Sequence, residues 1–328
     1  MKKHFFYILF TMLILSSQLF GQKVGVYKYA LKEVPLDYPS IISILDSTAN
    51  RFGFEVLAIT QMGSPEECEF KSTVISIVDP SFVNQLVKVN PTTAPYACVD
   101  KINVFQDENG THVSFVNPNS ILRTVLMNDK DYKPLAQEHT TKLVSWIREV
   151  LSGTATEDEY GQFRKKGYIS RTMGVMAGGP FIEKIQTIFE FSDKSLQEVS
   201  QLVQASFSVK GADYGIHEVF HYPVPGTNSV LFGVSGTPLD SKSFEIVRAG
   251  SDKSRKDFKC PGIAHASAYP LEVVMVEKDG KVMIQMVDAM FRMKIYFEDA
   301  GKWAFMKNMG MPGAIADEIK SLIEAKLK

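Results

Sequence analysis

The sequence has no excess of charge of either sign. Its 328 residues include 36 basic and 37 acidic side chains, which gives a formal net charge of −1, and no long run of Lys or Arg. Nucleic acids are bound through a basic surface, so this balance argues against nucleic acid as a partner. Hydrophobic residues make up 45% of the chain, which is enough for ordinary globular cores.

Beyond its first twenty residues the chain also lacks long apolar runs. At the start, Lys2 and Lys3 precede an apolar run over 5–15, and small residues follow up to Gly21. This order is typical of a secretory signal peptide, so we expect 1–21 to be removed and the protein to be periplasmic or secreted. The run is shorter than the roughly 20 residues that span a bilayer, and we expect no transmembrane segment in the mature chain. An uncleaved anchor is the alternative.

Cysteine is scarce. Only Cys68, Cys98 and Cys260 are present, an odd number for an oxidising compartment. At most one disulfide can form within the chain, and one thiol remains. The sequence leaves open whether any pair forms or whether all three are small buried residues.

Several catalytic signatures are missing. The chain has no G-x-S-x-G, no P-loop and no convincing dinucleotide fingerprint. Carboxylate pairs such as Asp107-Glu108 lie in expected turns, where a solvated charge is the ordinary outcome. The sequence therefore argues against an enzyme without deciding the question, and it leaves catalytic residues, cofactors and ligand-binding residues unknown.

What is present is an internal repeat. The runs around Asn109-Gly110 and Asp279-Gly280 both predict a tight hairpin, and they are 170 residues apart. The loops 91–94 and 261–264, each beginning with Pro, lie at the same offset. Pro134 and Pro312 each open a segment with a helical apolar stripe.

The remaining elements follow the same order. Strand, helix and two more strands are expected at 24–31, 39–51, 53–59 and 73–78, and again at 182–191, 196–208, 216–222 and 230–234. The second copy carries an insertion around 236–259. We therefore predict an α+β fold of two tandem copies, 22–151 and 182–328, each a small antiparallel sheet packed with helices. The copies form a pseudo-dimer, and 152–181 is a linker.

The first copy resembles domain-of-unknown-function family 302, whose members are small α+β domains found singly or in tandem. The resemblance rests on Asn90-Pro91 with Ala94, the hairpin strands 101–105 and 112–116, and Asn117-Pro118 at a helix start. It covers about 24–150 and, more weakly, 182–328, where Val287-Asp288 replaces Asn117-Pro118. The resemblance implies a fold and carries no mechanism.

One segment matches a zinc-peptidase signature. His217-Glu218-Val219-Phe220-His221 spells H-E-x-x-H. On a helix the two His lie about 6 Å apart along the axis and can share Zn²⁺, with the Glu as general base, whereas on a strand they lie roughly 13 Å apart. Nearby Gly and Pro favour a strand here, so we expect the match to be accidental. His217 and His221 are kept as metal candidates for an alternative zinc-dependent hydrolase.

A second metal candidate is a group of methionines. Met306, Met309 and Met311 lie close together in a segment that also contains Lys, Asn and Gly. Thioethers favour Cu(I), so Cu(I) binding is a further alternative. Methionine more often fills gaps in a core.

The sequence therefore favours an exported, non-enzymatic scaffold that binds an unknown small ligand or protein. Two docked copies would leave a cleft between them, which is the default place for a ligand.

Overall fold

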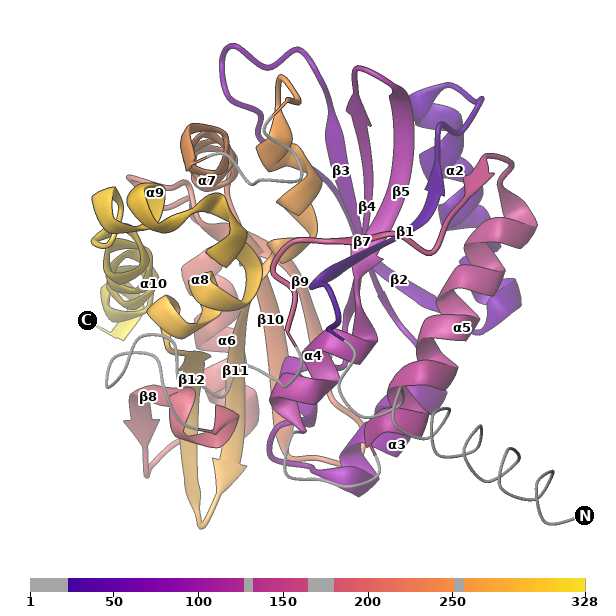
Figure 1. The fold of residues 1–328 in the computed structure, drawn as a ribbon. Helices are drawn as coiled ribbons and strands as arrows, with labels where there is room; N and C mark the ends of the chain where they lie inside the picture. The colour runs from indigo at the N-terminus through magenta and orange to yellow at the C-terminus, as the bar shows by residue number, and fades with distance from the viewer. Residues whose placement is uncertain (1–22, 127–131, 165–179, 251–256, 328) are drawn as a thin grey trace, which may run out of the picture.

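The computed structural model describes residues 23–126, 132–164, 180–250 and 257–327, and the expected signal peptide, 1–21, lies outside them. Two antiparallel sheets, each packed with helices, lie beside each other (Figure 1). The predicted α+β class with two copies of one architecture is confirmed. We call residues 23–164 the first half and 180–327 the second half. None of the described helices is long and apolar enough to cross a membrane.

The two halves contain the same succession of elements. The first half runs through β1 (Tyr27–Lys32), α2 (Tyr38–Ala49), β2 (Glu55–Gln61), β3 (Ser72–Val78), α3 (Pro80–Val89), the 3-10 helix η2 (Ala94–Tyr96), β4 (Asp100–Asp107), β5 (Gly110–Val116), α4 (Pro118–Val125) and α5 (Tyr132–Val150). The second half runs through β8 (Ile185–Phe191), α6 (Leu196–Phe207), β9 (His217–Pro223), β10 (Ser229–Ser235), α7 (Thr237–Gly250), the 3-10 helix η5 (Pro261–Ala268), β11 (Leu271–Lys278), β12 (Lys281–Val287), α8 (Ala289–Phe297), α9 (Lys302–Lys307) and α10 (Met311–Leu327).

The strand order is also shared. The first sheet contains the order β2-β3-β4-β5-β1 and the second reads β9-β10-β11-β12-β8, so these five strands correspond one to one, and the first sheet has two further short strands beside β1. The expected insertion at 236–259 contains α7, which occupies the place of α3. Both halves therefore have a helix in this connection, and the difference lies in its length and in the segment that follows it.

Local sequence explains where several helices begin. The carboxylate of Asp79 accepts a hydrogen bond from the backbone N–H of Ser81 at the start of α3. At the start of α4, where Pro118 is the first helical residue, the side chain of Asn117 accepts a hydrogen bond from the backbone N–H of Asn119. Ser195 and Glu198 form a reciprocal capping box at α6. Such caps satisfy N–H groups that have no partner inside the helix, and each stabilises it by about 1 kcal/mol.

The two predicted hairpins are present, but their turns differ. In the second hairpin Asp279 and Gly280 have φ of 52° and 74°, as a type I′ turn requires. In the first hairpin the turn residues are Glu108 and Asn109, one position earlier than expected, and Gly110 has φ of 131°. Asp107 explains the shift, because its carboxylate accepts from the N–H of Asn109 at 2.8 Å.

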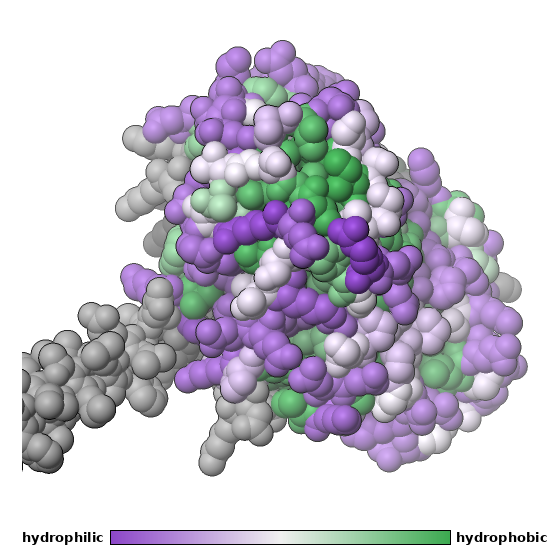
Figure 2. Space-filling model, turned by 90° about the vertical axis from the view of Figure 1, so that its right-hand side faces the viewer, coloured by the Kyte–Doolittle hydropathy of each residue, from purple (hydrophilic) through white to green (hydrophobic). Residues whose placement is uncertain are grey.

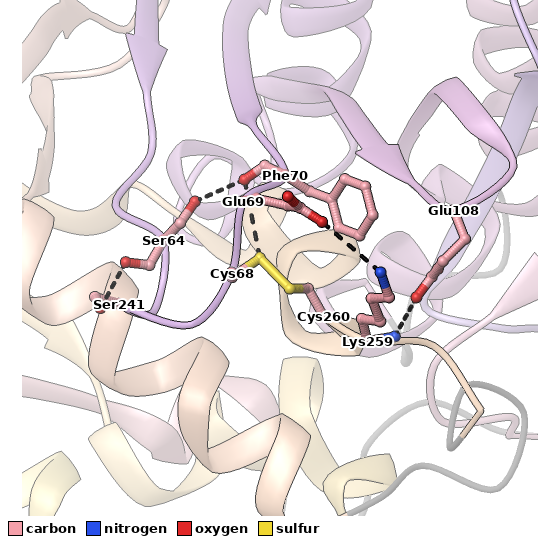
Figure 3. Close-up of a disulfide and its surroundings, with 8 residues drawn as sticks. All are labelled: Ser64, Cys68, Glu69, Phe70, Glu108, Ser241, Lys259 and Cys260. Atoms are coloured by element: carbon pink, nitrogen blue, oxygen red, sulfur yellow. Dashed lines mark hydrogen bonds and ion pairs between the residues drawn. A yellow bond between two sulfur atoms is a disulfide. The ribbon is translucent and has the colours of Figure 1, made fainter.

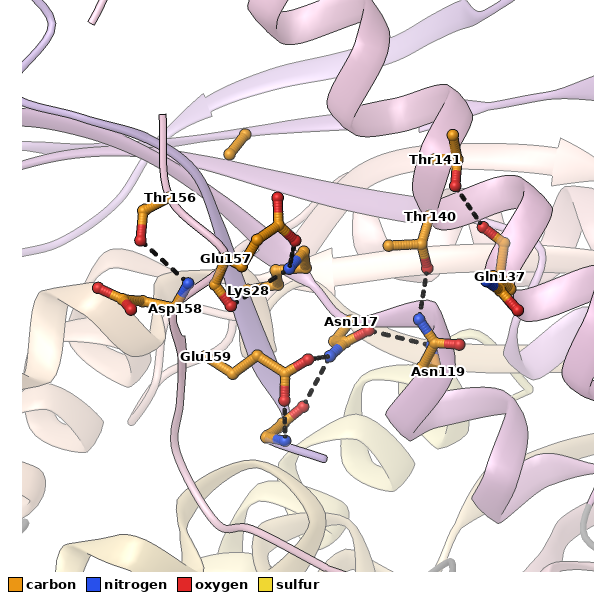
Figure 4. Close-up of polar contacts among 12 residues, drawn as sticks. Lys28, Asn117, Asn119, Gln137, Thr140, Thr141, Thr156, Glu157, Asp158 and Glu159 are labelled. Carbon is orange, nitrogen blue, oxygen red and sulfur yellow. Dashed lines mark hydrogen bonds and ion pairs between the residues drawn. The ribbon is translucent and has the colours of Figure 1, made fainter. Parts of the chain in front are cut away.

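The segment expected to be a linker contributes strands to the first sheet. Within 152–181, β6 (Thr154–Ala155) and β7 (Glu159–Tyr160) both pair with β1. Glu159 accepts hydrogen bonds from Gly25 and from Asn117, at 2.7 and 2.9 Å (Figure 4). These contacts hold the segment across the edge of the first sheet and against the start of α4.

The halves dock by exchanging loops. The 3-10 helix η5 of the second half packs against β3, β4 and β5 of the first sheet, and η2 of the first half packs against β10 and β11. One apolar cluster runs through both halves, whereas a second cluster fills the space between the first sheet and helices α2 and α5. On the side that lies to the right in Figure 1, a patch of apolar side chains is surrounded by a mostly polar surface (Figure 2).

A disulfide joins the halves. Cys68, in the connection between β2 and β3, is bonded to Cys260, just before η5, and their Cα atoms are 5.9 Å apart. Around it Ser241 donates to the carbonyl of Ser64 at 3.0 Å, and Lys259 contacts Glu69 (Figure 3). Cys98 is free and buried.

Candidate functional site

Three charged side chains form a buried cluster where the halves meet. Lys101 at the start of β4 contacts Glu272 at the start of β11, and the other oxygen of Glu272 accepts from Arg292 Nε at 2.8 Å. Arg292 lies on α8. The side chains of Lys101, Glu272 and Arg292 are only 5%, 11% and 9% exposed. We call these three residues the charged cluster.

Backbone carbonyls complete the cluster. Lys101 Nζ donates to the carbonyl of Pro270 at 3.0 Å. Arg292 Nη2 donates to the carbonyls of Ala268 and Pro270, which end η5 and lead into β11. Lys101 belongs to the first half, and its partners belong to the second. The cluster therefore links the two halves at the end of η5, in addition to burying three charged groups.

Neighbouring charges control the ionisation of the cluster. Burial alone would raise the pKa of Glu272, but Arg292 and Lys101 outweigh it and lower the pKa to about 2. Burial lowers the pKa of Lys101 to about 8, with Glu272 opposing the shift and Arg292 adding to it. At neutral pH two cations therefore share one carboxylate.

An apolar cavity of about 70 Å³ lies beside the cluster, inside the second half. It is lined by α7, α8, α10 and the β11–β12 hairpin. Most of its wall is apolar, and this part includes Leu271, Met286, Met293, Phe297, Met311 and Ile315. Ser243, Tyr269, Glu272 and Arg292 supply the polar part. An apolar cavity with a few convergent polar groups is the usual form of a small-molecule site.

Two tyrosines frame the guanidinium of Arg292. Its Cζ atom lies 4.7 Å from the ring centre of Tyr296 and 5.8 Å from that of Tyr269. Burial raises the pKa of both hydroxyls, so neither ionises near neutral pH. Tyr269 bonds to Ser243 at 2.6 Å. The arrangement holds the guanidinium plane in place.

A second buried pair lies nearby. His265 Nε2 is 2.8 Å from Asp299 Oδ2, and the other polar atoms of both side chains have no partner among the described residues. The ring of His265 packs edge-on against Tyr27 and stacks with Phe297. Tyr27 in turn donates to the carbonyl of Tyr296 at 2.9 Å.

The H-E-x-x-H residues lie on a strand. His217 and His221 are both part of β9, where His217 bonds to the carbonyl of Gly215 and the exposed His221 bonds to Glu218. The helix that a zinc peptidase needs is absent from this segment. The part of the chain that the structure describes contains no group of three or more His, Cys, Asp or Glu side chains placed to hold a metal.

The three methionines do not share one surface. Met306 and Met309 are exposed in and just after α9, whereas Met311 packs against the core at the start of α10 and lines the cavity. Copper binding by these residues stays a prediction.

Sequence reasoning missed the charged cluster. Lys101, Glu272 and Arg292 are separated by up to 191 positions and lie in two halves, so no spacing links them. The available signal was local. Glu272 and Arg292 are each a single charge between apolar neighbours, in a place where burial without a partner would be costly, whereas Lys101 follows Asp100.

The fold and the cavity thus define a two-sheet α+β protein with a small internal site. No protein-family model matches the chain, and no curated protein matches it. Among solved structures it is similar to an uncharacterized conserved protein of domain-of-unknown-function family 302 from Bacillus stearothermophilus. The two share 17% sequence identity over 38% of this chain and 98% of that chain, with a TM-score of 0.33.

Proposed function

We propose that the protein is an exported, non-enzymatic binding protein that holds a small, mainly apolar ligand in the cavity of its second half. The observation that supports this proposal is the apolar cavity between α7, α8, α10 and the β11–β12 hairpin. A cleft between the halves was the expected place, and two hollows there are lined by residues of both halves, one at Pro65 and Ser241 and one at Pro91 and Met283. The cavity of the second half is the more apolar and the more confined space, and it touches the charged cluster, so we place the ligand there.

Export has two independent supports. The sequence predicts a signal peptide at 1–21, and Cys68 forms a disulfide with Cys260. Disulfides persist in oxidising compartments and are rare in the cytosol. Cell fractionation, followed by thiol labelling of the denatured protein without reductant, tests this. We expect the protein in the exported fraction with Cys98 alone labelled. Labelling of all three cysteines in a cytosolic pool would contradict export.

Binding can be tested with a plugged cavity. We expect 1-hexanol to bind the signal-free protein saturably in isothermal titration calorimetry. Met293 lies on α8 in the cavity wall, so Met293→Trp should fill the space and weaken binding at least about tenfold. Met290 lies on the same helix, is also half-buried and does not line the cavity, so Met290→Trp is the matched control.

The outcome separates the site from unspecific binding. Equal loss in both tryptophan variants would place hexanol elsewhere and remove the proposal. Binding that persists in Met290→Trp and fails in Met293→Trp supports the cavity as the site.

A further inference from the structure

We propose that the ligand of this cavity is a short-chain organic anion, a carboxylate whose charged group binds Arg292 and whose chain lies among the apolar walls. The inference rests on the function proposed above and names the class of ligand. The carboxylate would enter the cavity beside the charged cluster and add the second negative charge that the cluster lacks.

The first argument is the balance of buried charge. Lys101 and Arg292 both contact Glu272, so two cations are buried with one carboxylate and the cluster carries a net charge of +1. Asp299 is another buried carboxylate of this region, but it bonds to His265. Asp240 bonds to Ser235 and to the N–H of Gly63. A buried charge without a counter-charge is unfavourable, so an anion at Arg292 would stabilise this arrangement.

The second argument is the set of donors on Arg292. Its Nε donates to Glu272, and its Nη2 donates to the carbonyls of Ala268 and Pro270. No described residue accepts a hydrogen bond from Nη1, and Arg292 is part of the cavity wall. A guanidinium offers donors in a fixed plane, and a carboxylate is the partner that matches this geometry. The N–H groups of Nη1 are therefore left for a ligand, and the side chain that carries them forms part of the cavity wall.

The third argument is the size and lining of the cavity. About 70 Å³ has room for roughly five water-sized groups, so the apolar body must be short. Met286, Met293 and Met311 contribute flexible thioether side chains to the wall. Methionine adapts its shape to irregular contents, which suits straight or branched chains of similar length.

A matched pair of ligands tests the charge. Hexanoate and 1-hexanol have the same chain, and only hexanoate carries a negative charge. In titration calorimetry on the signal-free protein at pH 7.5, we expect hexanoate to bind about 30-fold more tightly, the effect of one charge-assisted hydrogen bond pair. In a series from acetate to decanoate, affinity should be highest near hexanoate and fall for longer chains.

Three variants locate the anion. Arg292→Gln should reduce the affinity for hexanoate to that for hexanol, and Arg292→Lys should restore part of the difference. Lys101 does not line the cavity, yet Lys101→Met removes the excess positive charge. This variant should weaken the affinity for hexanoate several-fold and leave the affinity for hexanol unchanged. If Arg292→Gln does not fold, Lys101→Met and the ligand pair on the unaltered protein still decide the question.

Each outcome has a distinct meaning. If hexanol and hexanoate bind equally and Met293→Trp blocks both, the anion inference is wrong and the apolar binding function stands. If neither ligand binds, the proposed function fails as well. If hexanoate is preferred but neither Lys101→Met nor Met293→Trp changes its affinity, the anion binds elsewhere and the inference is overturned.

Discussion

The space between the sheet and the helices that cover it is more completely filled in the first half, where a cavity of about 20 Å³ remains, than in the second, where the cavity measures about 70 Å³. In the first half it lies among α3, α4, α5 and the β4–β5 hairpin. There the ring of His139 stacks on Phe82 with their centres 3.5 Å apart, and its Nε2 atom lies 2.7 Å from Asp100. In the second half the corresponding elements α7, α8, α10 and the β11–β12 hairpin enclose the cavity and Arg292.

The difference indicates a division of roles on one scaffold. A filled space contributes to stability, since close packing and satisfied hydrogen bonds both favour the folded state. A cavity with an excess of buried positive charge costs stability, and natural proteins keep such features where binding requires them. We therefore expect substitutions in the first half to act on stability and those in the second half to act on binding.

The largest effect is expected from the bond that holds the halves together. Cys68 and Cys260 are 192 positions apart, and closing so long a loop restricts the unfolded chain strongly. Cys68→Ser should lower the free energy of unfolding by about 4 kcal/mol in urea titrations. Cys98→Ser, at the free buried thiol, is the control and should cost less than about 1 kcal/mol. If the two variants lost the same free energy of unfolding, the disulfide would contribute no stability beyond that of an ordinary buried cysteine.

The next effect is expected from emptying the filled space. His139→Ala removes the ring that stacks on Phe82 and leaves the buried carboxylate of Asp100 without this partner. We expect a loss of about 3 kcal/mol in the free energy of unfolding, from the cavity and from the unpaired charge together. The affinity for hexanoate at the second half should not change. A parallel loss of affinity would contradict the division of roles.

A smaller effect is expected from a change of pH. Raising the pH should increase the stability that Asp79 contributes in the first half and decrease the stability that Asp240 contributes in the second. Burial would raise the pKa of Asp79, but Lys142 and Ser81 outweigh it and lower the pKa. Asp79 therefore stabilises the fold above its unfolded pKa near 3.8, and this contribution is lost as pH falls through the lower folded pKa. In the second half, burial raises the pKa of Asp240 to about 7, with Ser235 and Gly63 opposing the shift.

For Asp240 the dependence of stability on pH has the opposite sign. Its folded form keeps a proton that its unfolded form releases above pH 4, so its contribution is lost as pH rises from about 4 to 7. We expect the free energy of unfolding of the unaltered protein to fall, relative to that of Asp240→Asn, by on the order of 2 kcal/mol as pH rises across this range. Above pH 8 the difference between the two should not change further. Urea titrations at a series of pH values measure both. Asp79→Asn should instead destabilise the protein at pH 7, and its effect should decrease as pH falls below 3.8. Parallel curves for the protein and Asp240→Asn would contradict the assignment.

The sequence predicted what depends on local pattern. The second hairpin, the opening strands and helices, and the helices that contain Pro134 and Pro312 in their first turns occur where turn residues and apolar periodicity placed them, and the first hairpin differs by one residue at its turn. The loops 91–94 and 261–264 were recognised as equivalent. Their exchange between the halves was not, because it depends on contacts between surfaces far apart in the chain.

Other features could not be predicted because they arise only on folding. Three cysteines allow three pairings, and only the docking of the loop at Cys68 against η5 selects Cys260. The strands β6 and β7 have two residues each, too few to show a period in the expected linker. The cavity reflects the volumes of side chains from five elements, which no linear pattern encodes.

The smallest expected effect is that of adding apolar atoms to each half. It tests the comparison most directly, because the change in the free energy of unfolding should be positive in the second half and negative in the first. Ala289 lines the cavity at the start of α8, so Ala289→Leu adds apolar atoms to empty space. We expect it to raise the free energy of unfolding by about 1 kcal/mol and to weaken hexanoate binding at least tenfold.

The matched control is an alanine in the filled half. Ala136 on α5 is fully buried among close neighbours, so Ala136→Leu should lower the free energy of unfolding by about 2 kcal/mol through overpacking. Hexanoate affinity should be unaffected there. Because both changes add the same three carbon atoms, opposite signs cannot come from hydrophobicity and must reflect the space available. If both variants are destabilised alike, the second half is packed as closely as the first, and the case for a binding cavity is lost.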